Sequence, residues 1–509
     1  MKKQINQIRA GVLLSYVNLA LSSLIPMFYT PVMLRILGQA EHGLYSLAHS
    51  TVGYLTLLSF GFGSTIIRYL AKYRAQNDRE GVRRIFGFFL LLYSGLAVLV
   101  MAGGILLMQL APSIFDSSLS AAELDTVKKL IPLMAVQTAL NFPLSVYTSV
   151  LLAHERYLYR RIMDILATLV TPLFNLVMLY LGYASVGLVF SSLIVQFILF
   201  LPNVVYCTRV LGLTPSFRRM PGGVVREMVG FSAFVFLDSI VGMLFDATDK
   251  VLLGMLVGSA AVSIYQIGGT FNSMVMQFSA SFSGVLVPKI TGMVVRDAAP
   301  SQLTELFTRI GRLQFLVVAL AVTGFASFGQ AFIALWAGPE YREAYWVTVL
   351  TMFPLCVPLI QNTGYQILMA TNRHRFRAVV YLIVAIANVA TTWFAIPHMG
   401  IVGAALCSCV TYLCGHGLAI NLYYYKVVHL DIPAFWKQIG RMSLIPGCMM
   451  FVTIMLQRFV SIDSWLTFFP GVIVYAGAYC LLMYRFCMND YERSIIHAPL
   501  NKIRTLLRR

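Results

Sequence analysis

The stretch Phe236–Tyr265, FLDSIVGMLFDATDKVLLGMLVGSAAVSIY, decides how the rest of the sequence is interpreted. It is apolar enough to lie in a bilayer, yet it contains four ionisable side chains: Asp238, Asp246, Asp249 and Lys250. An ionisable group at membrane depth is costly unless it faces protein, water or an opposite charge. Because helical residues are rotated by about 100° each, the three aspartates share one helix face, which we expect to line a cavity.

Two structural alternatives remain open for these residues. Asp249 and Lys250 are also compatible with a hydrated helix end that is paired with lipid headgroups. Asp238, which lies deeper in the segment, is also compatible with a hydrogen bond between helices that serves only stability.

Composition defines the class of protein. The 509 residues are 59% hydrophobic and 11% charged, with a mean hydropathy of +0.77, so an integral membrane protein is expected. The net charge of +18 would suit nucleic acid only if the basic residues formed one water-facing surface with stacking aromatics. They occur instead in short groups between apolar runs, so no nucleic-acid partner is expected.

The apolar runs predict an all-α membrane protein with about fourteen transmembrane helices, since about 20 apolar residues cross a bilayer. The predicted spans are 10–34, 43–67, 85–110, 130–152, 162–182, 186–208, 228–252, 258–287, 313–336, 344–369, 378–397, 401–424, 442–457 and 465–484. Three regions follow: an N-terminal lobe at 1–227, a C-terminal lobe at 228–440, and spans 13 and 14 with a cytoplasmic amphipathic tail at 441–509.

The distribution of positive charge predicts the orientation. With a cytoplasmic N-terminus, 32 of the 38 Lys and Arg residues fall on the inner side of the predicted spans. Loops rich in Lys and Arg stay on the cytoplasmic side of a membrane. We therefore expect both termini to be cytoplasmic, in a multi-pass protein of the bacterial inner membrane.

A repeat relates the two halves of the sequence. Gly38 and Tyr45 recur as Gly258 and Tyr265, Arg156 and Arg160 as Arg373 and Arg377, and Asn175 and Gly187 as Asn388 and Gly400. The matches fall in the same order, and the offset between partners decreases slowly along the chain, as loop deletions would make it. Six spans per unit predict two pseudo-symmetric parallel lobes, with a substrate site near the midplane where the lobes meet.

Spans 1 and 7 are expected to face that site. Span 1 contains Asn18, Pro26 and Pro31 and ends at Arg35, and its prolines allow a kink or a hinge. Span 7 has Asp238 at the position that corresponds to Asn18. Acidic residues are therefore concentrated in the second lobe.

Motifs for common enzyme chemistry are absent from the sequence. It contains no GxxxxGK[ST], HExxH or GxSxG pattern, so no enzyme and no cofactor are expected. Its eight cysteines include no CxxC pair; packing residues are favoured over a metal site even where Cys407, Cys409, Cys414 and His416 cluster. A transporter of this kind would use an ion gradient, and a buried carboxylate suits H⁺ or Na⁺.

The sequence resembles a known family in three places. The run Pro31–Gly63 with TIIRYLAKY after it, the stretch ATDKVLLGMLVGSAAVSIYQIG, and the segment LLAHERYLYRRIMDI carry the resemblance. They are similar to polysaccharide exporters of the O-antigen and teichoic-acid flippase type, within the multidrug/oligosaccharidyl-lipid/polysaccharide (MOP) superfamily. The resemblance covers nearly the whole chain and implies the V-shaped, two-lobed fold of that superfamily.

The resemblance also implies a function and a set of site residues. The expected cargo is a polyprenyl-diphosphate-linked oligosaccharide, turned from the inner to the outer leaflet by alternating access. Expected substrate-binding residues are Arg35, Arg68, Lys250, Lys289 and Asn18, and expected ion-coupling residues are Asp238, Asp246 and Asp249. The lipid II flippases of the superfamily carry several arginines in span 1 and the neighbouring helix; span 1 here has only Arg35, which favours a more general glycan-lipid cargo.

Two other functions remain open. A cation-coupled multidrug exporter of the same superfamily would also use acidic residues, and a membrane scaffold that recruits glycosyltransferases would not need them. The expected partners are the lipid-linked glycan, membrane lipids and the glycosyltransferases or polymerase of the same pathway, and the chain is expected to be a monomer.

Overall fold

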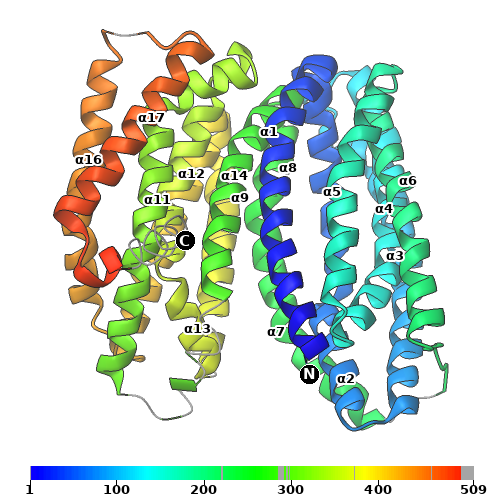
Figure 1. Cartoon of the computed structure of the whole chain (residues 1–509). Coiled ribbons are helices and arrows are strands. Elements are labelled where there is room, and N and C mark those ends of the chain that lie inside the picture. Colours follow the sequence, from blue (N-terminus) through cyan, green and yellow to red (C-terminus); the bar gives the residue numbers. More distant parts are fainter. Residues whose placement is uncertain are drawn as a thin grey trace, which may run out of the picture. The chain divides into compact units, whose positions relative to one another are not determined.

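The computed structural model describes the backbone of residues 2–218, 222–284, 290, 292–293, 296, 299–371, 373–459 and 461–494. These residues form helices and no strand (Figure 1), which confirms the all-α class. The elements are α1 (Lys2–Gly53), η1 (Tyr54–Ser59), α2 (Phe62–Ala75), α3 (Arg79–Phe115), α4 (Ala121–Ala153), α5 (Tyr157–Tyr180), α6 (Ala184–Val205), η2 (Tyr206–Val210), α7 (Gly222–Asp246), α8 (Thr248–Leu256), α9 (Ser259–Gly284), α11 (Pro300–Trp336), η3 (Pro339–Tyr341), α12 (Ala344–Ile360), α13 (Asn362–Ala370), α14 (His374–Tyr412), η4 (Leu413–Ile420), α15 (Asn421–Lys426), α16 (Ile432–Leu456), α17 (Trp465–Leu482) and η5 (Met483–Cys487).

The helices belong to two compact units. Unit 1 comprises Met1–Gln266 and Ala385–Ala404, and unit 2 comprises Ile267–Val384 and Ala405–Arg509. Unit 1 includes α7 and α8 because these helices pack on α2 and α1. The lobe boundaries expected from the sequence, after residues 227 and 440, stay a prediction.

Ten helical segments in the described part of the chain are long and apolar enough to cross a membrane, or eleven if α12 and α13 form one span with its 46° bend. The chain is therefore a multi-pass membrane protein. Gly38 (φ 77°) in α1 and Gly400 (φ 56°) in α14 leave the helical conformation and interrupt the helices that contain them. These left-handed values favour glycine. The number fourteen stays a prediction.

Helix lengths and junctions repeat along the chain. Both α3 and α11 have 37 residues. The α4–α5 junction at 153–157 has the same length as the α13–α14 junction at 370–374. Packing repeats as well, since the stacked rings of Tyr159 and Tyr206 recur at the same spacing as Phe376 and Tyr423.

One pair of the repeat differs from the expectation. Gly187 lies inside α6, whereas Gly400 lies at a helix break. The glycine that corresponds to Gly400 is Gly182 (φ 84°), which lies between α5 and α6. It is nearly as far from the start of α5 as Gly400 is from the start of α14. Gly182 and Gly400 match because both have a positive φ. Gly187 shares with Gly400 only its spacing from an asparagine.

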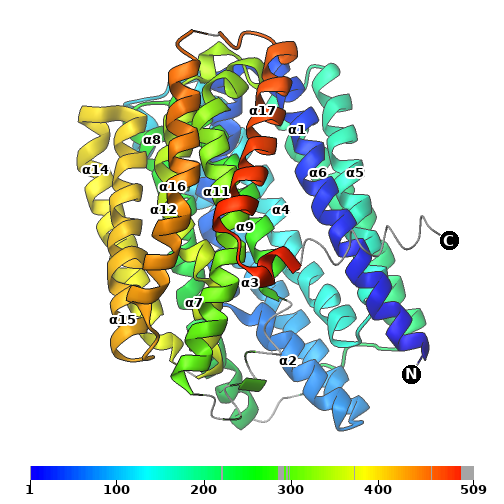
Figure 2. The same cartoon turned by 60° about the vertical axis from the view of Figure 1, so that its left-hand side comes forward.

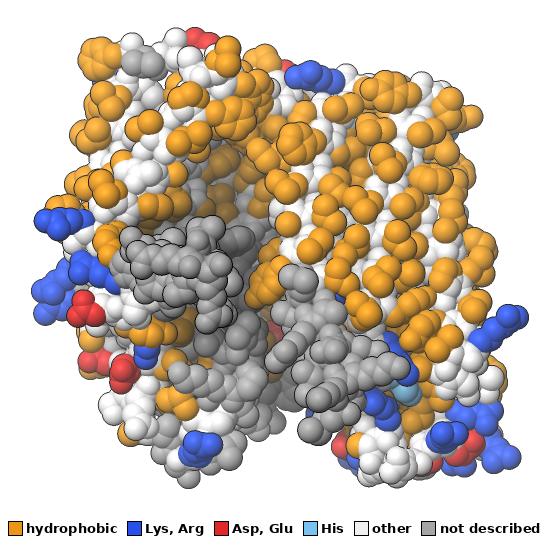
Figure 3. Space-filling model, in the orientation of Figure 1, with side chains coloured by type: hydrophobic (Ala, Val, Ile, Leu, Met, Phe, Trp, Pro, Cys, Tyr) orange, Lys and Arg blue, Asp and Glu red, His pale blue; other side chains and the backbone are white. Residues whose placement is uncertain are grey.

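The two ends of unit 1 differ in charge. At one end, Arg74 donates to the carbonyl of Ala153 (2.7 Å) and Arg83 donates to Thr214 (2.8 Å), which brings three connections rich in arginine together. At the other end, Ser118 donates to the carbonyl of Gly254 (2.5 Å), among connections without Lys or Arg. Figure 3 shows apolar side chains covering the helices between the ends, as a bilayer requires.

Small residues bring α1 close to α8 and α9. A Cβ at Gly43 would lie 1.8 Å from the carbonyl oxygen of Ser259, and one at Gly254 would lie 2.5 Å from the side chain of Leu47. Near this contact His42 shares a 2.7 Å hydrogen bond with Ser263. Backbones that approach this closely depend on glycine, as at many helix crossings in membranes.

Unit 2 contains a buried ion pair. Arg312 of α11 forms a bidentate contact with Glu492, at 2.6 and 3.0 Å, and their side chains are only 12% and 1% exposed. Figure 2 shows α11 beside α16 and α17, which pack against it. The expected amphipathic tail beyond residue 494 lies outside the described residues.

Candidate functional site

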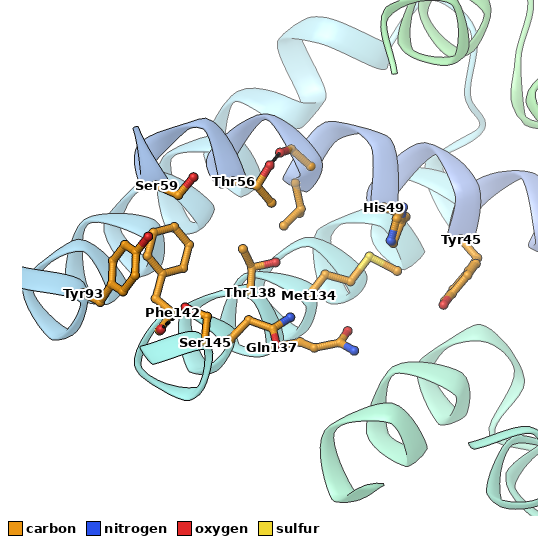
Figure 4. A pocket seen from close by; sticks show the side chains of 13 residues that line it. Tyr45, His49, Thr56, Ser59, Tyr93, Met134, Gln137, Thr138, Phe142 and Ser145 are labelled. Atoms are coloured by element: carbon orange, nitrogen blue, oxygen red, sulfur yellow. Dashed lines mark hydrogen bonds between the residues drawn. The ribbon is translucent and has the colours of Figure 1, made fainter. Parts of the chain in front are cut away.

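A cavity of about 360 Å³ lies within unit 1 between α1, η1, α3 and α4 (Figure 4). Its lining is formed by Tyr45, His49, Val52, Gly53, Thr56, Ser59, Tyr93, Met134, Gln137, Thr138, Asn141, Phe142 and Ser145. Figure 4 shows side chains of α1 and α4 pointing toward one another across it.

A break in the chain shapes one wall of the cavity. After α1 ends at Gly53, the chain forms the 3₁₀ turn η1 and then passes through Phe60 (φ 48°) and Gly61 (φ 69°). Gly61 has no space for a Cβ, which would lie 2.8 Å from the amide nitrogen of Phe236 on α7. Close packing against α7 therefore fixes the turn that carries Thr56 and Ser59.

The opposite wall is a polar stripe on α4. Gln137, Thr138, Asn141 and Ser145 recur at helical spacing in an otherwise apolar span. Ser145 donates back to the carbonyl of Phe142 (2.6 Å) and is satisfied. The side-chain amides of Gln137 and Asn141 have no hydrogen-bonding partner among the described residues. They are available to a ligand with hydroxyl or amide groups.

Aromatic rings close the cavity at both ends. Tyr45 stacks with His49, with ring centroids 6.4 Å apart, and Tyr93 contacts Phe142 edge to face at 5.4 Å. Such rings offer apolar faces beside polar groups. Together with the amides and hydroxyls they form the kind of surface that suits a sugar ring.

Charged groups lie beside the cavity rather than in its wall. Of the thirteen lining residues, none is Asp, Glu, Lys or Arg. His49 interacts electrostatically with Lys250 and Asp246. Lys250 forms a 3.3 Å ion pair with Asp246, and the Lys250 side chain is 11% exposed while that of Asp246 is 81% exposed.

Asp249 is the buried acidic residue of this neighbourhood. It has no exposed surface, and its carboxylate accepts a 2.5 Å hydrogen bond from the hydroxyl of Tyr265. The adjacent Thr248 shares a 2.6 Å hydrogen bond with the hydroxyl of Tyr54, which begins η1. The residues around Asp249 therefore connect α8 to the turn that forms the cavity wall.

That the three aspartates share one helix face stays a prediction, but their exposure differs. Asp238 and Asp246 are exposed, whereas Asp249 is buried. Helix α7 ends at Asp246 and α8 begins at Thr248, while Ala247 between them keeps right-handed helical dihedral angles (φ −99°, ψ −33°).

The other predicted site residues are dispersed. Arg35 is exposed on α1, and Arg68 is exposed on α2 with its guanidinium 4.6 Å from the ring of Phe231. Asn18 is half-buried and accepts a 3.3 Å hydrogen bond from Thr168 of α5. Lys289 lies outside the described residues. Only Asp246, Asp249 and Lys250 lie beside the cavity.

Sequence reasoning missed the cavity itself. Its signal was available in the polar stripe of span 4, where Gln137, Asn141 and Ser145 are each four residues apart. Uncharged polar residues inside an apolar span attract less attention than charged ones. They nevertheless mark a face that turns away from lipid.

The fold defines the class of protein. The structure is similar to that of the lipid II flippase MurJ in an inward closed conformation, with a TM-score of 0.73, 16% identity, and coverage of 95% of this chain and 100% of that one. It is also similar to an inward-facing multidrug resistance MATE family transporter of the MOP superfamily, with a TM-score of 0.63, 14% identity, and coverage of 83% and 99%. The protein therefore has the MOP superfamily fold.

Sequence comparison identifies the family. Residues 8–294, more than half of the chain, match the family described as polysaccharide biosynthesis protein, and the chain belongs to that family. It is 20% identical to the uncharacterized membrane protein EpsK of Bacillus subtilis over 94% of both chains. It is also 20% identical to the probable low-salt glycan biosynthesis flippase Agl15 of Haloferax volcanii, over 51% of this chain and 53% of that one. The resemblance to polysaccharide exporters of the MOP superfamily is confirmed.

Proposed function

We propose that this protein flips a polyprenyl-diphosphate-linked oligosaccharide, a precursor of cell-surface polysaccharide, from the inner to the outer leaflet by alternating access. The observation that carries the proposal is the uncharged cavity of unit 1, where amides, hydroxyls and aromatic rings converge. Sugars need such hydrogen-bonding groups and apolar faces. Membership of the polysaccharide biosynthesis protein family supports the same cargo.

The cavity also discriminates between cargo classes. A multidrug exporter that binds organic cations is expected to place a carboxylate at its site, because a charge removed from water is normally paired with an opposite charge. In the described part of the chain, the cavity wall contains no carboxylate. We therefore favour the glycan-lipid over a cationic drug.

The energy source in this proposal is a proton or sodium gradient, or the membrane potential. Asp249 is the best placed coupling residue, because it is buried and lies next to the turn that carries the cavity wall. Asp246 and Lys250 would tune its surroundings as a nearby ion pair. Asp238 is exposed and is the weaker candidate.

The proposed setting is the bacterial inner membrane, with both termini in the cytoplasm. The arginine-rich end of unit 1 would then face inward, in accord with the positive-inside rule. The protein would act as a monomer beside the glycosyltransferases and polymerase of its pathway, and it would catalyse no covalent chemistry.

Reconstituted protein tests the proposal. Vesicles with a fluorescent polyprenyl-diphosphate-linked oligosaccharide in the inner leaflet should show outward transfer, and the paired change Gln137→Ala with Asn141→Ala should slow it. Lys129→Ala on the same helix is the matched control, because its side chain is 62% exposed and outside the cavity. Transport of a dye cation in place of the glycan-lipid would overturn the assignment.

A further inference from the structure

Arg377 is a half-buried cation that lies between two tyrosine rings in unit 2. Its guanidinium carbon is 4.1 Å from the ring centroid of Tyr365 and 4.3 Å from that of Tyr381. The hydroxyl of Tyr381 shares a 2.7 Å hydrogen bond with Nδ1 of His416, which holds that ring in place. The rings stabilise the guanidinium by cation–π contact and leave its positive charge in place.

No carboxylate among the described residues forms an ion pair with Arg377. Charges removed from water are normally paired with an opposite charge. A guanidinium carries five N–H donors in a planar fork, which matches the oxygens of a phosphate group. Arg377 therefore keeps a positive charge that no described carboxylate neutralises.

The corresponding position of the first repeat shows what completes such a site. Arg160 is the fourth residue of α5, as Arg377 is of α14, and Asp164 is the eighth, as Tyr381 is. Arg160 forms a 2.8 Å ion pair with Asp164. The second repeat thus has a tyrosine where the first has the neutralising carboxylate. Asp164 neutralises the charge of Arg160, whereas Tyr381 leaves the charge of Arg377 in place.

The position of Arg377 along α14 fits the phosphate of a lipid. As the fourth residue of the helix, it lies about 4.5 Å from the helix start. Arg373 lies just before that start and donates to the carbonyl of Val427 (2.6 Å), so this end carries a cluster of arginines. Basic clusters at helix ends lie at the level of lipid headgroups, where phosphate groups are concentrated.

We propose that Arg377, held between Tyr365 and Tyr381, binds a phosphate group of a membrane lipid. The phosphate would supply the negative charge that the carboxylate of Asp164 supplies in the first repeat. Two lipids could supply it: an ordinary anionic phospholipid, or the diphosphate of a polyprenyl carrier. The site is separate from the cavity of unit 1 and does not depend on glycan binding there.

Native mass spectrometry of the full chain in uncharged detergent tests the site. The probes are a polyprenyl diphosphate, phosphatidylglycerol and the uncharged polyprenol. We expect wild-type protein to retain a phosphate-bearing adduct that Arg377→Gln and Tyr381→Asp each weaken by at least about tenfold. Tyr381→Asp is the sharper variant, because it keeps the arginine and supplies the carboxylate of the first repeat. Wild-type affinity in Tyr381→Asp would overturn the proposal.

Matched variants separate binding from folding. Arg160→Gln removes the paired arginine of the first repeat and leaves Arg377 and its tyrosines unchanged, so it should bind as wild type does. Thermal unfolding of every variant identifies those that are merely destabilised. Equal retention of the uncharged polyprenol would also overturn the proposal. Preference for the diphosphate supports the site with the carrier as its lipid, and equal competition by phosphatidylglycerol supports it with a phospholipid.

Discussion

Residues at corresponding positions of the sequence repeat have different partners. Arg160 is held by Asp164 at 2.8 Å, whereas Arg377 lies between tyrosine rings. The helix junctions that precede them have the same length, and the helices carry equivalent aromatic stacks. Backbone architecture is therefore retained where side-chain chemistry has diverged. Differences between the repeats indicate function better than either repeat alone.

The largest expected effect concerns Arg312, whose counterpart in α3 is the exposed Leu91. Arg312→Leu would give the second repeat the residue of the first, but it would leave Glu492 buried without its cation. Removing one partner of a buried pair costs about 3–5 kcal/mol. Chemical unfolding in detergent measures the loss. A loss below about 1 kcal/mol, or an equal loss in the control Leu91→Ala, would show that the pair does not stabilise unit 2.

The next expected effect distinguishes Tyr45 from Tyr265, which occupy corresponding positions of the two repeats. Tyr265→Phe removes the hydrogen bond to buried Asp249 and should lower stability by about 1–3 kcal/mol. Tyr45→Phe changes only the cavity wall, so it should reduce glycan-lipid transport and leave stability near wild type. Unfolding and transport assays on both variants test the distinction. Equal stability losses would contradict it.

A third effect concerns the polar stripe of α4. Counted back from the helix ends at 153 and 370, Gln137 and Asn141 correspond to Pro354 and Pro358, so the second repeat has no amides there. Replacing both amides with alanine should slow glycan-lipid transport about tenfold, since two hydrogen bonds are worth about 1–3 kcal/mol together. Initial transport rates measure it. The paired change Pro354→Ala with Pro358→Ala probes the other repeat and should alter helix geometry without affecting sugar affinity.

The smallest expected effect concerns Asp164, the carboxylate that the first repeat has where the second repeat has Tyr381. Asp164→Asn removes the carboxylate that pairs with Arg160, and both side chains are partly exposed, at 21% and 31%. Exposed ion pairs contribute about 0.2–1 kcal/mol, so the loss of stability should stay within that range. The same variant should bind an additional phosphate-bearing lipid in native mass spectrometry. An unchanged adduct count would mean that an unpaired arginine alone does not make a lipid site.

The sequence predicted what depends on composition and periodicity. Apolar runs identified an all-helical membrane protein, and the repeated Gly38 and Gly258 lie at positive φ in the structure. Family resemblance and comparison agree on the MOP superfamily. These features follow from local rules, because a bilayer imposes helices and a left-handed turn favours glycine.

The candidate site was harder to predict because it depends on tertiary contacts. Asp249 is buried whereas Asp238 and Asp246 are exposed, and this difference depends on what packs around each residue rather than on helical periodicity. Gln137 and Asn141 gain meaning only when α1 and η1 face them. Whether the charge of Arg377 is neutralised likewise depends on which side chains lie against it.

The close approach at Gly43 has a practical consequence. Because a single added methyl carbon would overlap the carbonyl oxygen of Ser259, any larger residue at this position would act as a steric wedge between α1 and α9. Such a wedge disfavours the packed arrangement without touching the cavity or the acidic residues. Gly43→Val therefore offers a way to loosen this helix crossing selectively and to measure how far stability depends on it.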